Sequence, residues 1–142
     1  MPFKRPKSIL VIVYTQDAQV LMLERVQPRG FWQSVTGSLQ EGELAIDAAR
    51  RELEEETGLS GELIVTGLEN TFPIVDEWRD RYAPDVFENH ETVFALQLES
   101  IREVHLNPSE HISQSWLPRL QAAKKASSWT NRDAILALVP DV

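Results

Sequence analysis

Short apolar segments separated by polar turns run through the N-terminal part of the chain. Residues 8–14 (SILVIVY) and 20–26 (VLMLERV) flank the polar connection TQDAQ, and this pattern predicts a hairpin of two buried strands. Residues 31–37, FWQSVTG, predict a third short extended piece that ends at Gly37. The chain therefore begins as a sheet built from neighbouring segments.

A helical pattern replaces the strand pattern after the turn EGE. The segment from Leu44 to Thr57 contains no glycine or proline, so we expect it to form a helix. Gly58 stands where a left-handed C-cap is expected, and Leu59 can fold back on the last turn.

The rest of the chain predicts further strands and two short helices. Residues 62–75 predict a long interrupted strand, and 91–98 and 102–106 two more, whereas the Pro, Asp and Asn content of 81–90 indicates a loop. Residues 117–126 and 130–139 predict helices, the second capped by Thr130 and Asp133. This order of elements is typical of an α/β or α+β sandwich with a mixed sheet. The length of 142 residues predicts a single domain over 1–142.

Composition narrows the possible partners. The formal net charge of −8 argues against a nucleic-acid groove, and the absence of cysteine excludes disulfides and thiolate sites. The longest apolar run, Ile9 to Tyr14, is far too short for a membrane span. We therefore expect a cytoplasmic protein that binds neither nucleic acid nor membrane.

Carboxylates are concentrated on the helix predicted over 44–57. At 100° per residue, Glu52, Glu55 and Glu56 fall within an arc of about 100°, and small alanines continue the same face toward the N-terminus. A solvated helix face is the ordinary explanation for such a charge run. The alternative is a site for a hard divalent cation such as Mg²⁺, with Mn²⁺ as a substitute.

The spacing around these glutamates favours the cation site. Five positions separate Gly37 from Glu43 and seven more separate Glu43 from Arg51, which opens the sequence RELEEETGL. This pattern resembles the Nudix box in full. The resemblance implies a Nudix-type α/β/α sandwich with a loop–helix–loop that binds Mg²⁺ and hydrolyses a nucleoside diphosphate linked to another group. It also implies metal ligation by Glu52, Glu55, Glu56 and the Gly37 carbonyl, with Arg51 orienting the glutamates and Glu43 supporting Arg51.

Weaker motifs from Lys4 to Ile135 resemble one branch of that family, the enzymes that act on dihydroneopterin triphosphate and are also described as dATP pyrophosphohydrolases. The stretches that carry the likeness include FWQSVTGS, RYAPDV and SSWTNRDAI. The resemblance implies a further metal contact from Glu110. It implies substrate contacts from Lys4, Arg25, Thr36 and Ser128, and from the stretch Phe72, Pro73, Ile74 and Val75.

Each of these residues also has an ordinary explanation. Lys4 and Arg25 could be surface cations, Glu110 a surface loop residue, and Ser128 a residue that merely precedes the cap of the last helix. The segment from Arg81 to Pro84 could shape a lid or a dimer contact.

The sequence leaves several functions open. The first is Mg²⁺-dependent hydrolysis of dihydroneopterin triphosphate to the monophosphate and pyrophosphate, a step of folate synthesis. The second is hydrolysis of dATP or oxidised dNTPs, and the third is a Nudix fold that binds without catalysis. Each has a small-molecule pterin or nucleoside triphosphate as the partner of a monomer or homodimer. The preferred substrate, the attacked phosphorus and the general base stay open.

Overall fold

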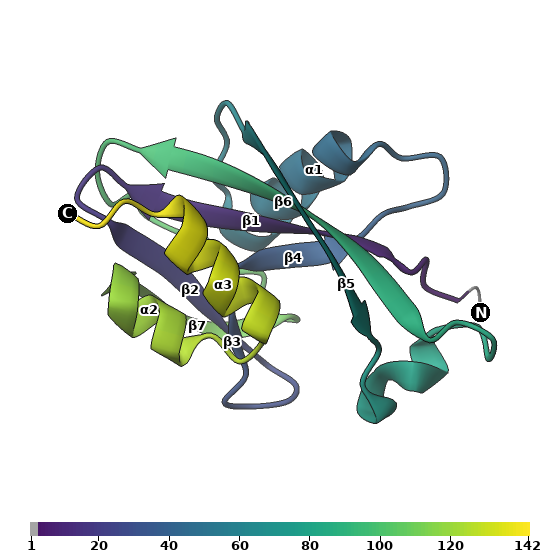
Figure 1. The fold of residues 1–142 in the computed structure, drawn as a ribbon. Coiled ribbons are helices and arrows are strands. Elements are labelled where there is room, and N and C mark those ends of the chain that lie inside the picture. Colours follow the sequence, from purple (N-terminus) through teal and green to yellow (C-terminus); the bar gives the residue numbers. More distant parts are fainter. Residues whose placement is uncertain (1–2) are drawn as a thin grey trace.

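Strands from both halves of the chain form one mixed sheet in the computed structural model, which describes residues 3–142 (Figure 1). The strands are β1 (Lys7–Thr15), β2 (Gln19–Arg25), β3 (Trp32–Gln33), β4 (Val35–Ser38), β5 (Ile64–Pro73), β6 (Glu88–Leu98) and β7 (His111–Pro118). Their order is β3-β2-β1-β6-β5, with β4 paired to β1 and β7 paired to β2. The β1–β6 pair is parallel and the others are antiparallel.

Helices cover both faces of this sheet (Figure 1). Helix α1 (Ala45–Thr57) lies on one face, and α2 (Arg119–Lys125) and α3 (Trp129–Leu138) lie on the other. Successive β1 residues point to opposite faces, so Ile9 and Val11 join the core beneath α1 whereas Leu10 and Ile12 join the core beneath α2 and α3. The predicted α/β/α sandwich with a mixed sheet is confirmed.

The first hairpin opens along its length. β1 and β2 pair at Tyr14 and Val20, and beyond that point β2 pairs with β3 while β1 pairs with β4. The other edge of β2 pairs with β7 along its whole length. The chain crosses from β3 to β4 at Ser34. We call the opening between β1–β4 and β2–β3 the fork. It brings Gly37 of β4 to a place where the sheet is no longer continuous.

The strand predictions are wrong in three places. Residues 102–106 form no strand, because the segment binds the end of α1, where the His105 N–H donates to the Thr57 carbonyl at 2.8 Å. Strand β7 was not predicted, because its His, Ser and Gln side chains conceal the alternation. The region 81–90, expected to be a loop, begins at the end of a 3₁₀ helix, η1 (Asp76–Arg81), and ends inside β6.

Of the two predicted helix caps, the one after α1 is confirmed and the one before α3 is wrong. Gly58 adopts the expected left-handed conformation with a φ of 74° after α1. Helix α3, however, is capped by Ser128, whose hydroxyl oxygen accepts a hydrogen bond from the Asn131 N–H at 3.2 Å. Thr130 is buried inside the first turn, so the predicted cap of Thr130 and Asp133 is wrong.

None of the helices within residues 3–142 has the length and apolar character needed to cross a bilayer.

Candidate active site

Helix α1 packs directly against β4 through its small residues. Ala48 and Ala49 are completely buried beneath the helix. A Cβ added to Gly37 would lie 1.6 Å from a carboxylate oxygen of Glu52. Only glycine therefore lets the Glu52 side chain lie across the β4 backbone, and this contact brings the helix glutamates to the fork.

Glu56 is the most enclosed of these glutamates. Its side chain is 1% exposed, and neither carboxylate oxygen has a hydrogen-bond partner among the described residues. Burial, followed by the charge of Glu52, raises the pKa of Glu56 well above its usual range. The backbone N–H of Thr36 opposes this shift without reaching hydrogen-bonding geometry. A carboxylate in this position requires a proton or a cation.

His111 does not supply that cation. Its Nε2 lies 3.9 Å from a Glu56 oxygen, close enough to count as an ion pair if the ring were charged. Burial, followed by the charge of Arg25, lowers the pKa of His111 to about 4, so the ring is neutral at pH 7. The contact is therefore between a neutral imidazole and a carboxyl group.

Glu52 shares the same surroundings but keeps one cationic partner. Burial, followed by a hydrogen bond with Glu55, raises the pKa of Glu52 to about 7. Arg51 Nη1 donates to a Glu52 oxygen at 2.7 Å and reaches Glu55 at 3.5 Å. Glu55 itself stays 53% exposed, so it does not lie on the close-packed side where the sequence places it. Arg51 holds it outside.

Arg51 joins the loop to the helix. Its Nε and Nη2 each donate to Glu43 at 2.9 Å, and Nη2 also donates to the Ser38 carbonyl at 3.2 Å. The hydrogen bonds from Arg51 lower the pKa of Glu43 to about 2. This geometry suits the orienting role that the sequence predicts for Arg51 and the supporting role predicted for Glu43.

The inner glutamates suit a divalent cation, but their side chains are not arranged as a complete coordination sphere. Across residues 3–142 no group of three His, Cys, Asp or Glu side chains stands in metal-binding geometry. The partnerless oxygens of Glu56 and the raised pKa values of both inner glutamates indicate a missing positive charge. Glu110, whose charge also acts on Glu56, lies nearby on the loop before β7, where its carbonyl accepts from the Val26 N–H at 2.8 Å.

Three cations lie near this acidic group: Lys4 and Arg25 respond to its charges, and Arg81 acts on both of them. Burial, followed by the charges of Arg81 and Arg25, lowers the pKa of Lys4, while Glu52 and Glu110 act in the opposite direction. Burial, followed by Arg81, likewise lowers the pKa of Arg25. Within the described part of the chain none of the three cations forms an ion pair.

Loops from distant parts of the sequence bring these cations together. The Lys4 N–H donates to the Arg81 carbonyl at 2.8 Å, which ties the chain start to the end of η1. The Arg25 guanidinium lies 5.7 Å from the Trp78 ring centre, and Phe31 packs edge-on against the same ring at 5.5 Å. Sequence reasoning did not place Arg81 or Trp78 here, because only the 3₁₀ helix η1 brings them to β2.

The remaining predicted contacts lie around the fork. The Thr36 hydroxyl donates to the Ile9 carbonyl at 2.7 Å, and Ser128 serves as the α3 cap itself rather than as a residue before the cap. Residues 72–75 connect the end of β5 to η1, with Ile74 buried and Val75 47% exposed. Their substrate contacts stay predictions.

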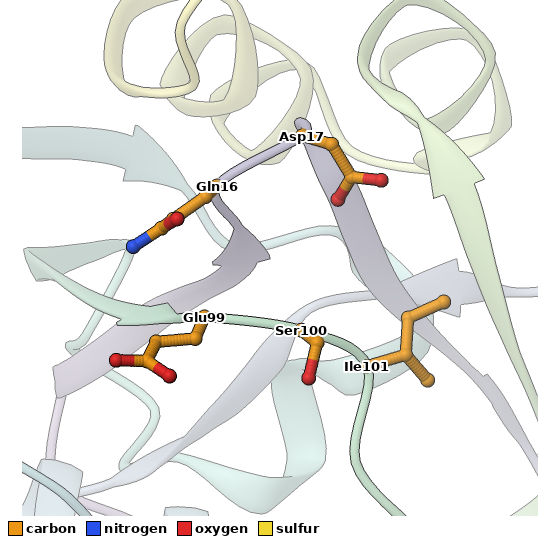
Figure 2. A pocket seen from close by; sticks show the side chains of 5 residues that line it. All are labelled: Gln16, Asp17, Glu99, Ser100 and Ile101. Atoms are coloured by element: carbon orange, nitrogen blue, oxygen red, sulfur yellow. The ribbon is translucent and has the colours of Figure 1, made fainter.

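A separate hollow of about 530 Å³ lies at the far end of the sheet (Figure 2). It is lined by Gln16, Asp17, Glu99, Ser100 and Ile101. Seven residue steps along β1, about 23 Å of strand, separate Thr15 beside it from Ser8 near the fork. The hollow carries two carboxylates and no cation, so it does not suit a triphosphate.

A model of the NUDIX domain matches residues 4–138. The chain belongs to the Nudix family. The dihydroneopterin triphosphate diphosphatase of Escherichia coli is 44% identical over 139 residues, covering 94% of this chain and 91% of that protein. The Haemophilus influenzae protein of the same name is 35% identical over 141 residues, covering 95% of this chain and 88% of that protein.

Solved structures agree with this assignment. The structure of the E. coli dihydroneopterin triphosphate pyrophosphohydrolase matches with a TM-score of 0.92 and 43% identity, covering 98% of both chains. The family resemblance inferred from the box between Gly37 and Leu59 is thereby confirmed. The box of this Nudix protein is the segment that runs from β4 through α1 to the turn at Gly58.

Proposed function

We propose that this Nudix protein hydrolyses dihydroneopterin triphosphate to the monophosphate and pyrophosphate. The observation that carries the reaction class is a group of three cations without an ion-pair partner among residues 3–142. Lys4 and Arg25 respond to the charges of the inner glutamates of α1, and Arg81 acts on both cations. Two relatives at 44% and 35% identity, named for that substrate, support the pterin as the organic group. The dATP activity is the alternative within the same reaction class.

The residues present suit Mg²⁺, with Mn²⁺ as a substitute. Glu52, Glu56, Glu110 and the Gly37 carbonyl would hold it, with Glu55 once it is released from Arg51. When bound, the ion neutralises phosphate charge and makes a water more acidic.

The protein's own side chains bind and orient the substrate. Lys4, Arg25 and Arg81 are suited to the phosphate oxygens, because arginine and lysine form charge-assisted hydrogen bonds with them. Arg51 holds Glu52 in one position through its bonds to Glu43 and the Ser38 carbonyl. Neutral His111 packs beside Glu56 and adds no competing positive charge.

The domain organisation, location, oligomeric state and partners of the protein are further proposals. We propose a single domain over 1–142, a cytoplasmic location, a monomer or homodimer, and no nucleic-acid partner. The net charge of −8 supports the last of these, because nucleic-acid surfaces are usually basic.

The test is a comparison of kcat/KM for dihydroneopterin triphosphate, dATP, dGTP, 8-oxo-dGTP and dCTP at one Mg²⁺ concentration and pH, with products identified. We expect the pterin substrate to be first, purines well behind and dCTP last, with pyrophosphate released from each. If dATP or 8-oxo-dGTP exceeds the pterin substrate, the pterin proposal is wrong. If no substrate is hydrolysed, the Nudix protein acts by binding alone.

A further inference from the structure

Glu91 is a buried carboxylate that the proposed chemistry does not use. It lies on β6, is 5% exposed, and shares its side of the strand with Val93 and Ala95 of the core beneath α2 and α3. Asn70 Nδ2 donates to it at 3.2 Å and the Thr130 hydroxyl also bonds to it, but no cation of the described chain pairs with it. Burial accordingly raises the pKa of Glu91.

The strand register connects Glu91 with the Nudix box. Ser8 of β1 is the direct partner of both Glu91 on β6 and Ser38 on β4. Direct partners point to the same face, so Ser38, Ser8 and Glu91 form a polar row on the side opposite α1. Two strand spacings, about 10 Å, therefore separate Glu91 from the strand that carries Gly37. One substrate molecule is long enough to span this distance.

Asn89 adds a second acceptor to this row. It is 4% exposed, its Nδ2 donates to the Ser8 hydroxyl at 2.7 Å, and its Oδ1 has no partner within residues 3–142. Asn89 and Glu91 are two residues apart on one strand, so they share a face at a spacing of about 7 Å. Buried acceptors are normally satisfied, so the Asn89 Oδ1 indicates an absent N–H donor beside Glu91, which itself accepts from Asn70 and Thr130.

Helix α3 begins beside this row. The Ser34 N–H donates to Asn131 Oδ1 at 2.8 Å, and Asn131 Nδ2 donates to the Ser34 hydroxyl at 2.9 Å, which fixes the start of α3 beside β4. Figure 1 shows that α3 stops short of the end of β6 that follows η1. Phe72, the direct partner of Asn89, places a half-buried aromatic ring on the same face.

We propose that Glu91, assisted by Asn89, recognises the 2-amino-4-oxo edge of the substrate ring. The adjacent N–H and NH₂ groups of this edge can donate two parallel hydrogen bonds to the two oxygens of one carboxylate. Pterin and guanine present these donors, whereas adenine and cytosine do not. The inference rests on the proposed function, since it concerns the ring specificity of the same site.

Glu91→Gln is the decisive variant, because glutamine keeps the size and replaces one acceptor oxygen by an NH₂ group. We expect kcat/KM to fall about a hundredfold or more for dihydroneopterin triphosphate and dGTP, since an unmatched buried hydrogen bond is a strong discriminator. The value for dATP should change by no more than about threefold. Glu88→Gln, an exposed position on the same strand, is the matched control and should leave all three values unchanged.

The outcomes separate the recognition role from a structural one. An equal loss for all three substrates would show that Glu91 only supports the fold and would overturn the inference. Glu91→Asp keeps the charge and is the substitute if the glutamine variant does not fold. It should retain the preference for dGTP over dATP, and loss of that preference would also overturn the inference.

A second measurement distinguishes this inference from the proposed function. Calorimetry with 7,8-dihydroneopterin and with guanosine, neither of which has phosphates, should show binding to the wild type and none to Glu91→Gln. If the wild-type enzyme prefers dATP to the pterin triphosphate, the proposed function fails, and the dGTP to dATP ratio alone decides the role of Glu91. Unchanged guanosine binding by Glu91→Gln would overturn the inferred role of Glu91.

Discussion

Glu56 is the residue on which the proposed metal site depends most. Glu56→Gln keeps the shape and removes a buried charge without a partner, so turnover should fall at least about a hundredfold, as loss of electrostatic stabilisation commonly causes. The melting temperature without metal should not fall, because repulsion with Glu52 is removed. Glu54→Gln, on the exposed side of α1, is the control. A Glu56→Gln protein with wild-type kcat/KM would contradict the proposed site.

Arg81 tests the cation trio. Arg81→Ala removes a charge that lowers the pKa values of both Lys4 and Arg25, and it removes one proposed phosphate contact. Charge-assisted hydrogen bonds contribute about 1.5–3 kcal/mol, so kcat/KM for a triphosphate should fall by about tenfold to a hundredfold. Arg132→Ala, an exposed arginine on α3, should have no effect on steady-state kinetics. Equal activities of the two variants would remove Arg81 from the site.

At the scale of elements, the contact between β4 and α1 should depend on Gly37. Gly37→Ala places a methyl group where Glu52 lies, and a displacement of about 1 Å in such a site can reduce activity about a hundredfold. Gly67→Ala is the opposite case, since it has open space but a φ of 78°, and should cost about 1 kcal/mol of stability while activity is retained. Measuring kcat/KM and unfolding free energy for both separates the two effects. An active Gly37→Ala enzyme would mean that Glu52 can move freely.

The loop that precedes α1 should show a pH-dependent contribution to stability. The folded-state pKa of Glu43 is about 2, below its usual 4.5, because of the hydrogen bonds from Arg51. A lowered carboxyl pKa stabilises the fold above about pH 4.5, and this contribution is lost as pH falls toward 2. The melting temperature of Glu43→Gln should therefore lie below that of wild type at pH 6, and the two should converge at low pH. Glu41→Gln, exposed on the same loop, should follow the wild type.

The elements differ in how far the sequence determines them. Helix α1 was predicted because its limits are local: a run without Gly or Pro and a glycine in the left-handed region. Strand β7 was not, because its pairing with β2 is a long-range contact that its polar sequence does not reveal. The sequence predicts the α3 cap at Thr130 because serine and threonine are both good caps. In the fold Thr130 is buried and bonds to Glu91 of β6, so Ser128 forms the cap.

At the scale of the whole molecule, metal binding should stabilise the fold. A ligand that binds only the native state adds about 2.7 kcal/mol at a hundred times its Kd. The melting temperature should therefore rise with millimolar Mg²⁺ in the wild type and much less in Glu56→Gln. A melting temperature that does not change with Mg²⁺ in the wild type, with or without pyrophosphate, would contradict the proposed ion.

The site as a whole was only partly predictable. The box residues from Gly37 to Glu56 are close in sequence, so their spacing was enough to predict the family. The roles proposed for Arg81 and Glu91 could not be predicted from the sequence, because they depend on strands and loops that only the fold brings beside these residues. A carboxylate looks alike in sequence whether it is solvated or buried without a cation.

The fork in the sheet has a consequence for how such a protein can change over time. The glutamates proposed to hold the metal lie on α1, whereas the acceptors proposed to recognise the ring lie on the α3 side of β6. The two groups sit on different elements and share no hydrogen bond among those described. Substitutions at β6 and at the start of α3 could therefore exchange one organic group for another while the hydrolytic machinery stays intact. A descendant of this chain could acquire a new substrate without first losing its reaction.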